Sequence, residues 1–282
     1  MADRGLRRLC FGLSTVLGLG RRGIFIPYRH ADSLDAPIGR ATHLAVEAHL
    51  RAHERAFEDV LGLIESYAPA LEQIGTAAPP EPRFAQDWFP RLDAAAAYAI
   101  VRAYRPPRIV EVGSGHSTRF LARAAKDGGF TTEITAIDPK PRADLAGLGS
   151  VKLVRRTLQE AGLDAFAPVR AGDIVFIDSS HVLMPGSDVD ILLNRVLPAL
   201  PTGVLVHLHD IFLPDGYPAE WAWRGYNEQL AVIPILLGGS VELGFSSRYV
   251  ATRMPAALSK GVLGRLPRPA GAVESSLWLR TR

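Results

Sequence analysis

The feature that most constrains the fold is a short apolar run that ends in a pair of glycines. Residues 109–112 (Ile-Val-Glu-Val) are rich in β-branched side chains, as expected of a buried strand, and Gly113-Ser114-Gly115 follows at once. Beyond the glycines, Phe120, Leu121 and Ala124 recur at helical spacing. The stretch therefore predicts a strand, a tight turn and a helix, which together open an α/β sheet with helices on both faces.

The glycine turn also predicts a ligand-binding loop. Gly113 and Gly115 allow positive φ and let a ligand approach the backbone, with Ser114 between them. Ser117 and Thr118 can cap the helix behind the turn. Nucleotide and dinucleotide folds both use such a turn, so the residues around it must decide between ligands.

Two acids and a missing glycine indicate which kind of ligand the turn binds. Glu111 is expected to point at the crevice from the end of its strand, where it would repel a pyrophosphate and attract an ammonium group. Thr118 stands where the dinucleotide fingerprint has its third glycine. Asp138 ends the next predicted strand, roughly 20 residues on, at the spacing that suits hydrogen bonds to ribose hydroxyls. The pattern suits a ligand with a ribose, an adenine and a cationic amino-acid tail.

The motif Glu111-Val-Gly113-Ser-Gly115 with Ser117-Thr118, followed by Ile137-Asp138-Pro139, resembles the class I S-adenosylmethionine-dependent methyltransferases. It is most similar to their bacterial small-molecule branch, which carries a Gly-Ser-Gly-x-Ser-Thr loop. The resemblance covers about residues 84–282 and implies S-adenosylmethionine as cofactor. An NAD-dependent oxidoreductase is the alternative enzyme, and a non-catalytic cofactor-binding protein is the alternative from another class. The expected cofactor-binding residues are Glu111, Gly113, Ser114, Gly115, Ser117, Thr118, Asp138 and Asp178.

The rest of the sequence fits an α/β fold of this kind. The resemblance implies a Rossmann-like, seven-stranded sheet with helices on both faces, whose final hairpin contains the one antiparallel strand. Apolar runs bounded by polar or turn residues predict the strands. Helices are expected at 92–101, 187–200 and 218–237. The predicted strands are 108–112, 133–138, 151–154, 173–178, 203–210, 241–245, 247–251 and 276–280.

The chain is expected to divide near residue 82. Residues 42–74 carry apolar side chains at helical spacing among charged ones, and 76–82 (Thr-Ala-Ala-Pro-Pro-Glu-Pro) is rich in helix breakers. We therefore expect a basic and apolar segment with a helical arm at 1–82, and the methyltransferase domain at 83–282.

Residues 1–29 leave two interpretations open. Arginines flank the apolar run 9–20, which is too short and glycine-rich to span a bilayer. Arg21 and Arg22 stand where a signal peptide would have small residues for cleavage. The segment either packs as a helix on its own domain or on a second subunit of a homodimer, or it makes a peripheral contact with an anionic membrane surface.

Composition excludes several other classes. The single cysteine, Cys10, rules out an internal disulfide framework and a multi-cysteine zinc site, which fits a cytoplasmic protein. The net charge of +3 is small, and no basic run is interleaved with aromatic residues, so no nucleic acid partner is expected.

Polar clusters follow the predicted fourth and fifth strands, where an open α/β sheet binds its ligands. They are Asp178 to His181 and His209-Asp210, and both end long apolar runs where burial of polar groups is costly without a purpose. Methyl transfer to the hydroxyl of a small molecule or glycan needs a group that accepts the hydroxyl proton. His181 and His209 are the candidate bases, and Asp210 completes the candidate catalytic set.

A divalent cation is the other route to an activated hydroxyl. Some relatives in the resembled superfamily hold Mg²⁺ with acids at the ends of these two strands, and Asp178 and Asp210 match two such positions. Ile211 stands where those relatives carry another oxygen ligand, which leaves His209, Asp215 or water to complete a site. The resemblance also places Trp88, Phe89 or Asp93 against the cofactor. Tyr217, Trp221, Trp223 and Tyr226 form either an aromatic wall for the acceptor or plain core.

Overall fold

The computed structural model describes residues 2–33 and 42–282. Contacts divide the chain into two compact units, Met1–Ile38 and Gly39–Arg282, which are described separately here. Of the predicted segment 1–82, Met1 and residues 34–41 lie outside the described part.

The first unit is built around one helix. Helix α1 spans Ala2–Val16, and a short 3₁₀ turn covers Ala31–Ser33. The backbone after α1 folds back on the helix end, where Leu19 N–H donates to the carbonyl of Ser14 at 2.9 Å. Among the residues that the structure describes, no helix has the length and apolar character that crossing a membrane requires.

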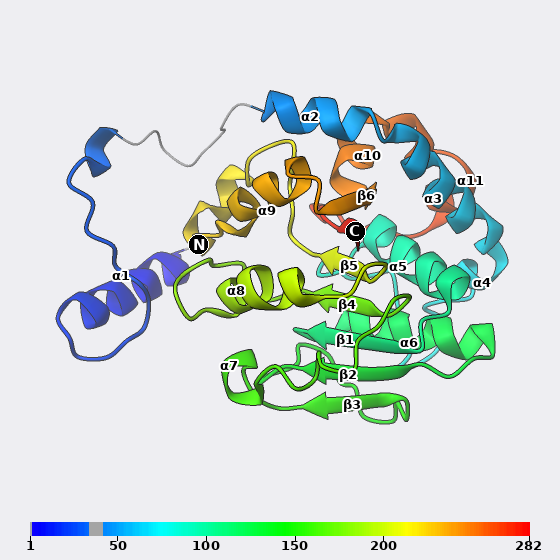
Figure 1. Cartoon of the computed structure of the whole chain (residues 1–282), viewed down its shortest axis with the longest axis horizontal. Helices are drawn as coiled ribbons and strands as arrows, with labels where there is room; N and C mark the ends of the chain where they lie inside the picture. Colours follow the sequence, from blue (N-terminus) through cyan, green and yellow to red (C-terminus); the bar gives the residue numbers. More distant parts are fainter. Residues whose placement is uncertain (1, 34–41) are drawn as a thin grey trace. The chain divides into compact units, whose positions relative to one another are not determined.

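The second unit contains a mixed sheet of seven strands, counted over the described residues, in the order β3-β2-β1-β4-β5-β7-β6. Figure 1 shows β3, β2, β1, β4 and β5 side by side. Strands β1 to β5 are parallel, and β7 runs antiparallel to both β5 and β6. This confirms the predicted fold class. The strands are β1 Arg108–Val112, β2 Glu133–Ile137, β3 Val151–Val154, β4 Ile174–Ile177, β5 Leu205–Leu208, β6 Val241–Ser246 and β7 Leu277–Thr281.

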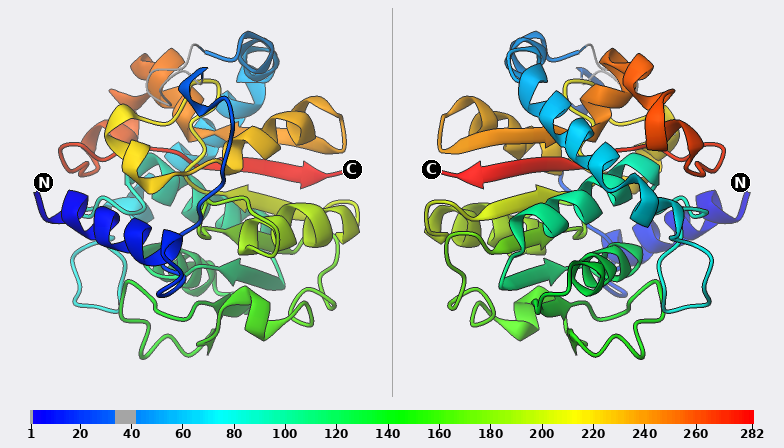
Figure 2. Two further views of the ribbon diagram at one scale, coloured as in Figure 1. Left: turned by 90° about the vertical axis from the view of Figure 1, so that its left-hand side faces the viewer. Right: turned by 90° about the vertical axis from the view of Figure 1, so that its right-hand side faces the viewer.

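Helices cover both faces of this sheet, so its central strands are buried on both sides. Figure 2 shows α5 and α6 in front of the strands in one view and α8 in front of them in the opposite view. The α-helices of the second unit are α2 Leu44–Arg51, α3 Glu54–Ser66, α4 Ala68–Glu72, α5 Arg91–Tyr104, α6 His116–Gly128, α7 Leu158–Ala161, α8 Asp188–Ile191, α9 Glu228–Leu237, α10 Ser247–Arg253 and α11 Gly261–Arg265. A π turn (Leu192–Val196) and a 3₁₀ turn (Leu197–Ala199) continue α8, and 3₁₀ turns also cover Ala219–Arg224 and Pro255–Leu258.

The structure corrects one predicted strand. Residues 247–251 belong to helix α10, although their apolar and β-branched content reads as a strand. The side chain of Ser246 caps this helix by accepting a hydrogen bond from Tyr249 N–H at 3.2 Å. Tyr249 and Val250 are buried against the core. The cap and this one-sided burial favour the helix over an extended strand.

Helices α2 to α4 share the hydrophobic core of the sheet. Val46, Leu50 and Phe57 are at most 1% exposed, and the Phe57 ring lies edge-on to Phe245 of β6 at 5.9 Å. The hydroxyl of Tyr249 donates to Glu54 at 2.6 Å, which ties α3 to α10. The second compact unit, Gly39–Arg282, therefore includes α2 to α4 together with the sheet.

Candidate active site

The glycine turn between β1 and α6 is packed against the end of β4. Gly113 has φ +82°, and a Cβ at this position would lie only 1.8 Å from the carbonyl oxygen of Asp178. Both facts require glycine. The turn brings the ends of β1 and β4 together, and with them the first loop and the Asp178 cluster.

Glu111 differs from the expectation that its carboxylate faces the crevice. The side chain is fully buried, and its two oxygens accept hydrogen bonds from the hydroxyls of Ser117 and Thr118, each at 2.6 Å. Thr118 also accepts a hydrogen bond from Gly115 N–H at 3.0 Å. The three side chains therefore fix the first turn of α6 beneath the loop and do not line the cleft. Burial is the main cause that raises the pKa of Glu111 to about 8.

A cleft of about 470 Å³ opens above the carboxyl ends of β1, β2 and β4. Gly113, Ser114, Asp138 and Asp178 line it, as expected of cofactor-binding residues. The carboxylate of Asp138 accepts hydrogen bonds from the backbone N–H and hydroxyl of Ser114, at 2.7 and 3.0 Å. These bonds hold the loop against the end of β2 and keep the acid at the cleft.

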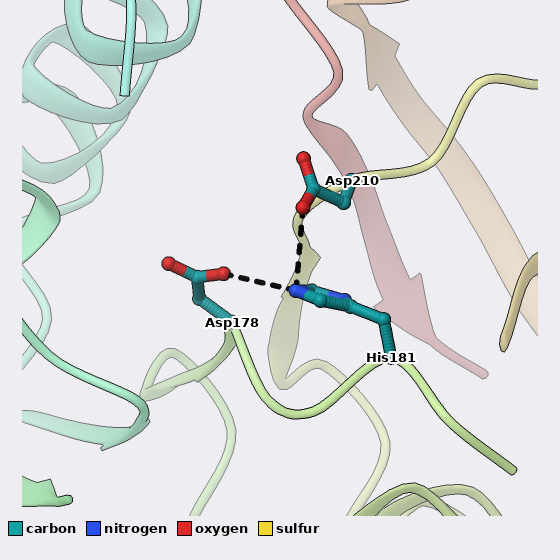
Figure 3. Close-up of side chains that lie close together, drawn as sticks. All are labelled: Asp178, His181 and Asp210. Atoms are coloured by element: carbon teal, nitrogen blue, oxygen red, sulfur yellow. Dashed lines mark ion pairs between the residues drawn. The ribbon is translucent and has the colours of Figure 1, made fainter. Parts of the chain in front are cut away.

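The ends of β4 and β5 bring Asp178, His181 and Asp210 together, as Figure 3 shows. His181 Nε2 lies 3.3 Å from Asp178 Oδ1 and 3.4 Å from Asp210 Oδ2. The other ring nitrogen, Nδ1, donates to Glu228 Oε2 of helix α9 at 2.8 Å. The imidazole is 2% exposed, so its position is set by three carboxylates from three different elements.

The backbone at this cluster is unusual. His181 has φ +59° and Asp210 has φ +54°. Among the non-glycine residues that the structure describes, only these two and Arg105 have positive φ. Such a conformation costs of order 1–3 kcal/mol at each residue and persists where the surroundings hold it. Two of the three residues in the cluster are therefore held at an energetic cost.

His209 forms a second imidazole–carboxylate network beside the first. Its Nε2 lies 3.4 Å from Asp93 Oδ2, and its Nδ1 lies 3.5 Å from Asp178 Oδ1 and 3.6 Å from Asp210 Oδ1. Asp93, in the first turn of α5, is fully buried and accepts hydrogen bonds from the backbone N–H groups of Ser275 and Ser276. It therefore orients His209 and does not reach the cleft.

The carboxylates raise the pKa values of both histidines. Burial by itself lowers the pKa of His181, but hydrogen bonds to Asp178 and Glu228 raise it well above the ordinary value. Burial likewise lowers the pKa of His209, and the charges of Asp178 and Asp210 more than reverse that effect. The pKa of Asp178 is held well below its ordinary value, because the charge of His209 and the hydrogen bond from His181 outweigh burial. The cluster thus favours positive charge at its centre.

A smaller cavity of about 140 Å³ adjoins the cleft. Asp178 and Arg142 line both spaces, so the two are neighbours. The guanidinium of Arg142 lies over the Trp88 ring at 4.2 Å, and that of Arg224 lies over Trp221 at 4.0 Å. The lining comprises Asp87, Trp88, Arg142, Asp178, His209, Asp210, Trp221, Arg224, Gly271 and Val273.

The aromatic residues divide between this cavity and the core. Trp88 and Trp221 line the cavity, whereas Phe89 is 2% exposed and packs against His209 at 5.4 Å. Tyr226 packs against the His181 ring at 4.6 Å and lies edge-on to Trp221 at 6.0 Å. Part of the expected aromatic wall therefore borders the cavity, and Tyr226 packs against the cluster of Asp178, His181 and Asp210.

The donor set of Asp178, His181 and Asp210 fits a divalent cation. One ligand atom from each lies within 4.8 Å of the others. The single proton on His181 Nε2 faces two carboxylates at the long end of hydrogen-bonding range, whereas one cation would satisfy all three groups. Asp215, an expected alternative ligand, is instead paired with Arg253 at 2.7 Å.

Some residues of the site were not identified from the sequence. Neither Glu228 nor Arg142 belongs to a sequence motif, so the residues next to them in the chain do not indicate that they are parts of a site. Ser275, whose hydroxyl donates to Asp210 at 3.2 Å, precedes the last strand and reaches the site only through the antiparallel pairing of β7.

Comparison with known proteins gives one family match. Residues 110–211 match the family model described as "Methyltransferase domain". No curated protein matches the chain.

Several solved structures are similar to this chain at low identity. A methyltransferase from Podospora anserina, bound to S-adenosylhomocysteine, is 16% identical, covers 92% of this chain and 99% of its own, and has a TM-score of 0.42. A Staphylococcus aureus protein provisionally assigned as a caffeoyl-CoA O-methyltransferase is 12% identical, with coverages of 85% and 99% and a TM-score of 0.42. A branched-chain polyamine synthase mutein from Thermus thermophilus is 16% identical, with coverages of 76% and 63% and a TM-score of 0.42.

The family match spans the glycine turn, Asp138, the Asp178 cluster and Asp210. The predicted resemblance to the methyltransferases is thereby confirmed over residues 110–211.

Proposed function

We propose that this chain transfers a methyl group from S-adenosylmethionine to a hydroxyl of a small molecule or glycan. The observation that carries the proposal is the pair of adjoining spaces that share Asp178 and Arg142. One has the glycine loop and Asp138, which suit a nucleoside, and the other has His209 and Asp210, which suit a hydroxyl. Methyl transfer is an in-line displacement, so the donor sulfur and the acceptor oxygen must lie on opposite sides of the methyl carbon.

The larger cleft suits a cationic methyl donor. Gly113 and Ser114 line the cleft, and Asp138 at the end of β2 is placed to accept hydrogen bonds from ribose hydroxyls. Asp178 keeps its negative charge at the boundary between the two spaces, where it would stabilise a sulfonium group. Glu111 supports this site indirectly, by holding the first turn of α6.

The smaller cavity supplies the groups that an acceptor hydroxyl needs. His209 faces it beside Asp210, and Asp93 holds the far side of the ring. A cation bound beside the cluster disfavours a protonated imidazole, so donor binding should lower the raised pKa of His209 and free it to accept the hydroxyl proton. Asp178 and Asp210 then stabilise the imidazolium that forms.

We also propose that Asp178, His181 and Asp210 hold a divalent cation such as Mg²⁺. When bound, the ion would lower the pKa of an acceptor hydroxyl. Glu228 would orient His181 by accepting the hydrogen bond from its Nδ1. Chelation with EDTA followed by readdition of Mg²⁺ or Mn²⁺ tests this: activity should fall and return, and unchanged activity after chelation would exclude a metal role.

Isothermal titration of the full chain with S-adenosylmethionine and S-adenosylhomocysteine tests the donor. We expect binding of both, and about tenfold or greater weakening in Asp138→Ala, since the variant loses a charged hydrogen-bond acceptor. Absence of binding to either compound would overturn the proposal. A nicotinamide fluorescence titration addresses the oxidoreductase alternative.

Turnover distinguishes an enzyme from a binding protein with the same cleft. A panel of small-molecule and glycan hydroxyl acceptors, assayed for formation of S-adenosylhomocysteine, should contain a substrate. His209→Ala should lower kcat by about 10²-fold or more with unchanged affinity for S-adenosylhomocysteine. Equal kcat in the variant would remove His209 from the reaction.

A further inference from the structure

The first unit carries an amphipathic helix whose apolar face is uncovered within that unit. In α1, Leu6, Leu9, Leu13 and Val16 fall at spacings of three and four, which places them on one face, and Leu17 follows directly after the helix. Each of these side chains is more than half exposed. An apolar face of this kind needs a partner that the unit itself does not provide.

The opposite face of α1 is polar and basic. Arg7, Arg8, Ser14 and Thr15 lie there by the same periodicity. The guanidinium of Arg7 lies over the Phe11 ring at 5.2 Å, which keeps an aromatic side chain next to a positive charge. The Thr15 hydroxyl donates to the carbonyl of Phe11, so this polar group is satisfied within the helix.

A second exposed apolar segment follows the helix. Ile24, Phe25 and Ile26 are each 60% to 64% exposed. Arg21-Arg22 precede them and Arg29 follows them. The unit therefore repeats one arrangement, an apolar surface bordered by arginines, in its helix and in the segment after it.

Charge distinguishes among possible partners. Residues 1–30 contain six arginines and one aspartate, a net charge of +5, so the remaining 252 residues carry −2 of the total of +3. Two copies of this segment would repel one another, whereas an anionic surface would attract it. A basic polar face and a leucine-rich apolar face are the properties of helices that lie in a lipid interface.

We propose that residues 2–29 bind the surface of an anionic lipid bilayer, with the apolar face of α1 and the side chains of Ile24–Ile26 inserted at the interface. The arginines of the segment pair with lipid phosphates. Residues 2–29 belong to the first unit and the proposed methyl-transfer site belongs to the second, so lipid binding can be tested independently of the proposed activity.

Vesicle flotation of the full chain tests the proposal. We expect the protein to float with vesicles of phosphatidylcholine and phosphatidylglycerol, and to float much less with phosphatidylcholine alone or at high salt. The variant Leu9→Glu/Leu13→Glu should lose this binding. The control Leu44→Glu/Leu163→Glu makes the same change at two exposed leucines of the second unit and should bind as the wild type does.

Two double variants that replace arginine by glutamate test how much charge contributes to vesicle binding. Arg7→Glu/Arg8→Glu should weaken partition into anionic vesicles by about tenfold or more, because attraction at two positions becomes repulsion. Arg55→Glu/Arg265→Glu changes net charge equally at exposed positions of the second unit and should have a much smaller effect. Equal loss in both pairs would mean that net charge alone, and not this segment, drives binding.

The single cysteine gives a direct readout of insertion. Cys10 is exposed and lies beside Leu6 and Leu17 on the helix surface. An environment-sensitive fluorophore attached to Cys10 of the otherwise unchanged chain should shift its emission to the blue on anionic vesicles. A label that stays in a water-like environment while the protein floats would contradict insertion of this face.

Oligomeric state decides between lipid and a second copy. Light scattering after size exclusion should give the monomer mass of 30.5 kDa for the wild type and for Leu9→Glu/Leu13→Glu. A wild-type dimer that this variant dissociates, together with no flotation on anionic vesicles, would overturn the proposal and assign the face to self-association. Thermal unfolding of both proteins controls for loss of fold.

Discussion

At the scale of single residues, Glu111 combines complete burial with two short hydrogen bonds from hydroxyls. Burial dominates, and the charges of Asp178 and Asp138 also raise its pKa, which lies at about 8. At pH values between the ordinary pKa of a glutamate and this raised pKa, Glu111 is protonated in the folded chain and ionised in the unfolded chain. The stability from that proton is complete at acidic pH and is lost as the pH rises towards 8.

Glu111→Gln should therefore flatten the pH dependence of stability. The free energy of unfolding of the wild type should fall more steeply than that of the variant between about pH 5 and pH 8, by up to about 1.4 kcal/mol per pH unit. Urea unfolding across this range measures the two slopes. Parallel slopes would mean that Glu111 is already ionised in the folded chain.

A substitution at Gly113 measures how closely the ends of β1 and β4 must approach each other. Gly113→Ala places a Cβ at 1.8 Å from the carbonyl of Asp178 and also strains a φ of +82°. Gly172→Ala is a matched control, because its φ is +86° and nothing lies within 4 Å of the added Cβ. We expect a loss of roughly 1 kcal/mol in the control and at least about 2 kcal/mol more at Gly113, measured by urea unfolding. Equal losses would show that the β1 and β4 ends separate at little cost.

At the scale of elements, a single acid links several parts of the second unit. Asp93 of α5 accepts hydrogen bonds from Ser247 of α10 and from backbone groups just before β7, and it lies beside His209 after β5. Asp173 is a buried acid in a comparable role at the other end of the sheet, where it accepts from Arg108 N–H at 3.0 Å and Arg170 N–H at 2.8 Å. The two acids allow a structural effect to be separated from an effect on the site.

Asp93→Asn and Asp173→Asn should each lower stability by about 2–4 kcal/mol, since each removes a buried charged acceptor. Only Asp93→Asn should also lower kcat and shift its pH profile, because His209 loses the carboxylate that orients it. Urea unfolding and turnover at several pH values measure the two effects. The same pH profile in both variants would reduce Asp93 to a purely structural role.

The elements also show what a single sequence can reveal. The strand, turn and helix at 108–128 follow from local signals, a β-branched run, two glycines and a periodic helix, so they were predictable. The strand predicted at 247–251 was wrong because Ser246 is a local helix-capping signal that the prediction did not use, and because the burial of Tyr249 depends on packing. Polar residues at strand ends could be placed because parallel strands end at one edge of a sheet. Glu228 reaches His181 from 47 residues away, and no local pattern carries that contact.

At the scale of the whole molecule, the position of the domain boundary has a measurable consequence. Helices α2 to α4 contribute Val46, Leu50, Phe57, Ile64 and Leu71 to the core of the second unit, each at most 1% exposed. Loss of one such side chain costs about 2–5 kcal/mol, and a domain of this kind has only about 5–15 kcal/mol of total stability. The sheet should therefore not remain folded without these helices.

Removal of residues 1–38 should leave the cooperative unfolding transition and the affinity for S-adenosylhomocysteine unchanged, because the cleft proposed to bind the cofactor and its supports lie in Gly39–Arg282. Removal of residues 1–82 should abolish both, since it exposes the apolar surface that α2 to α4 cover. Circular dichroism on heating and calorimetric titration compare the two truncated chains. If the shorter chain still unfolds cooperatively and binds, the boundary expected after residue 82 is correct, and α2 to α4 are an addition that the folded sheet does not need.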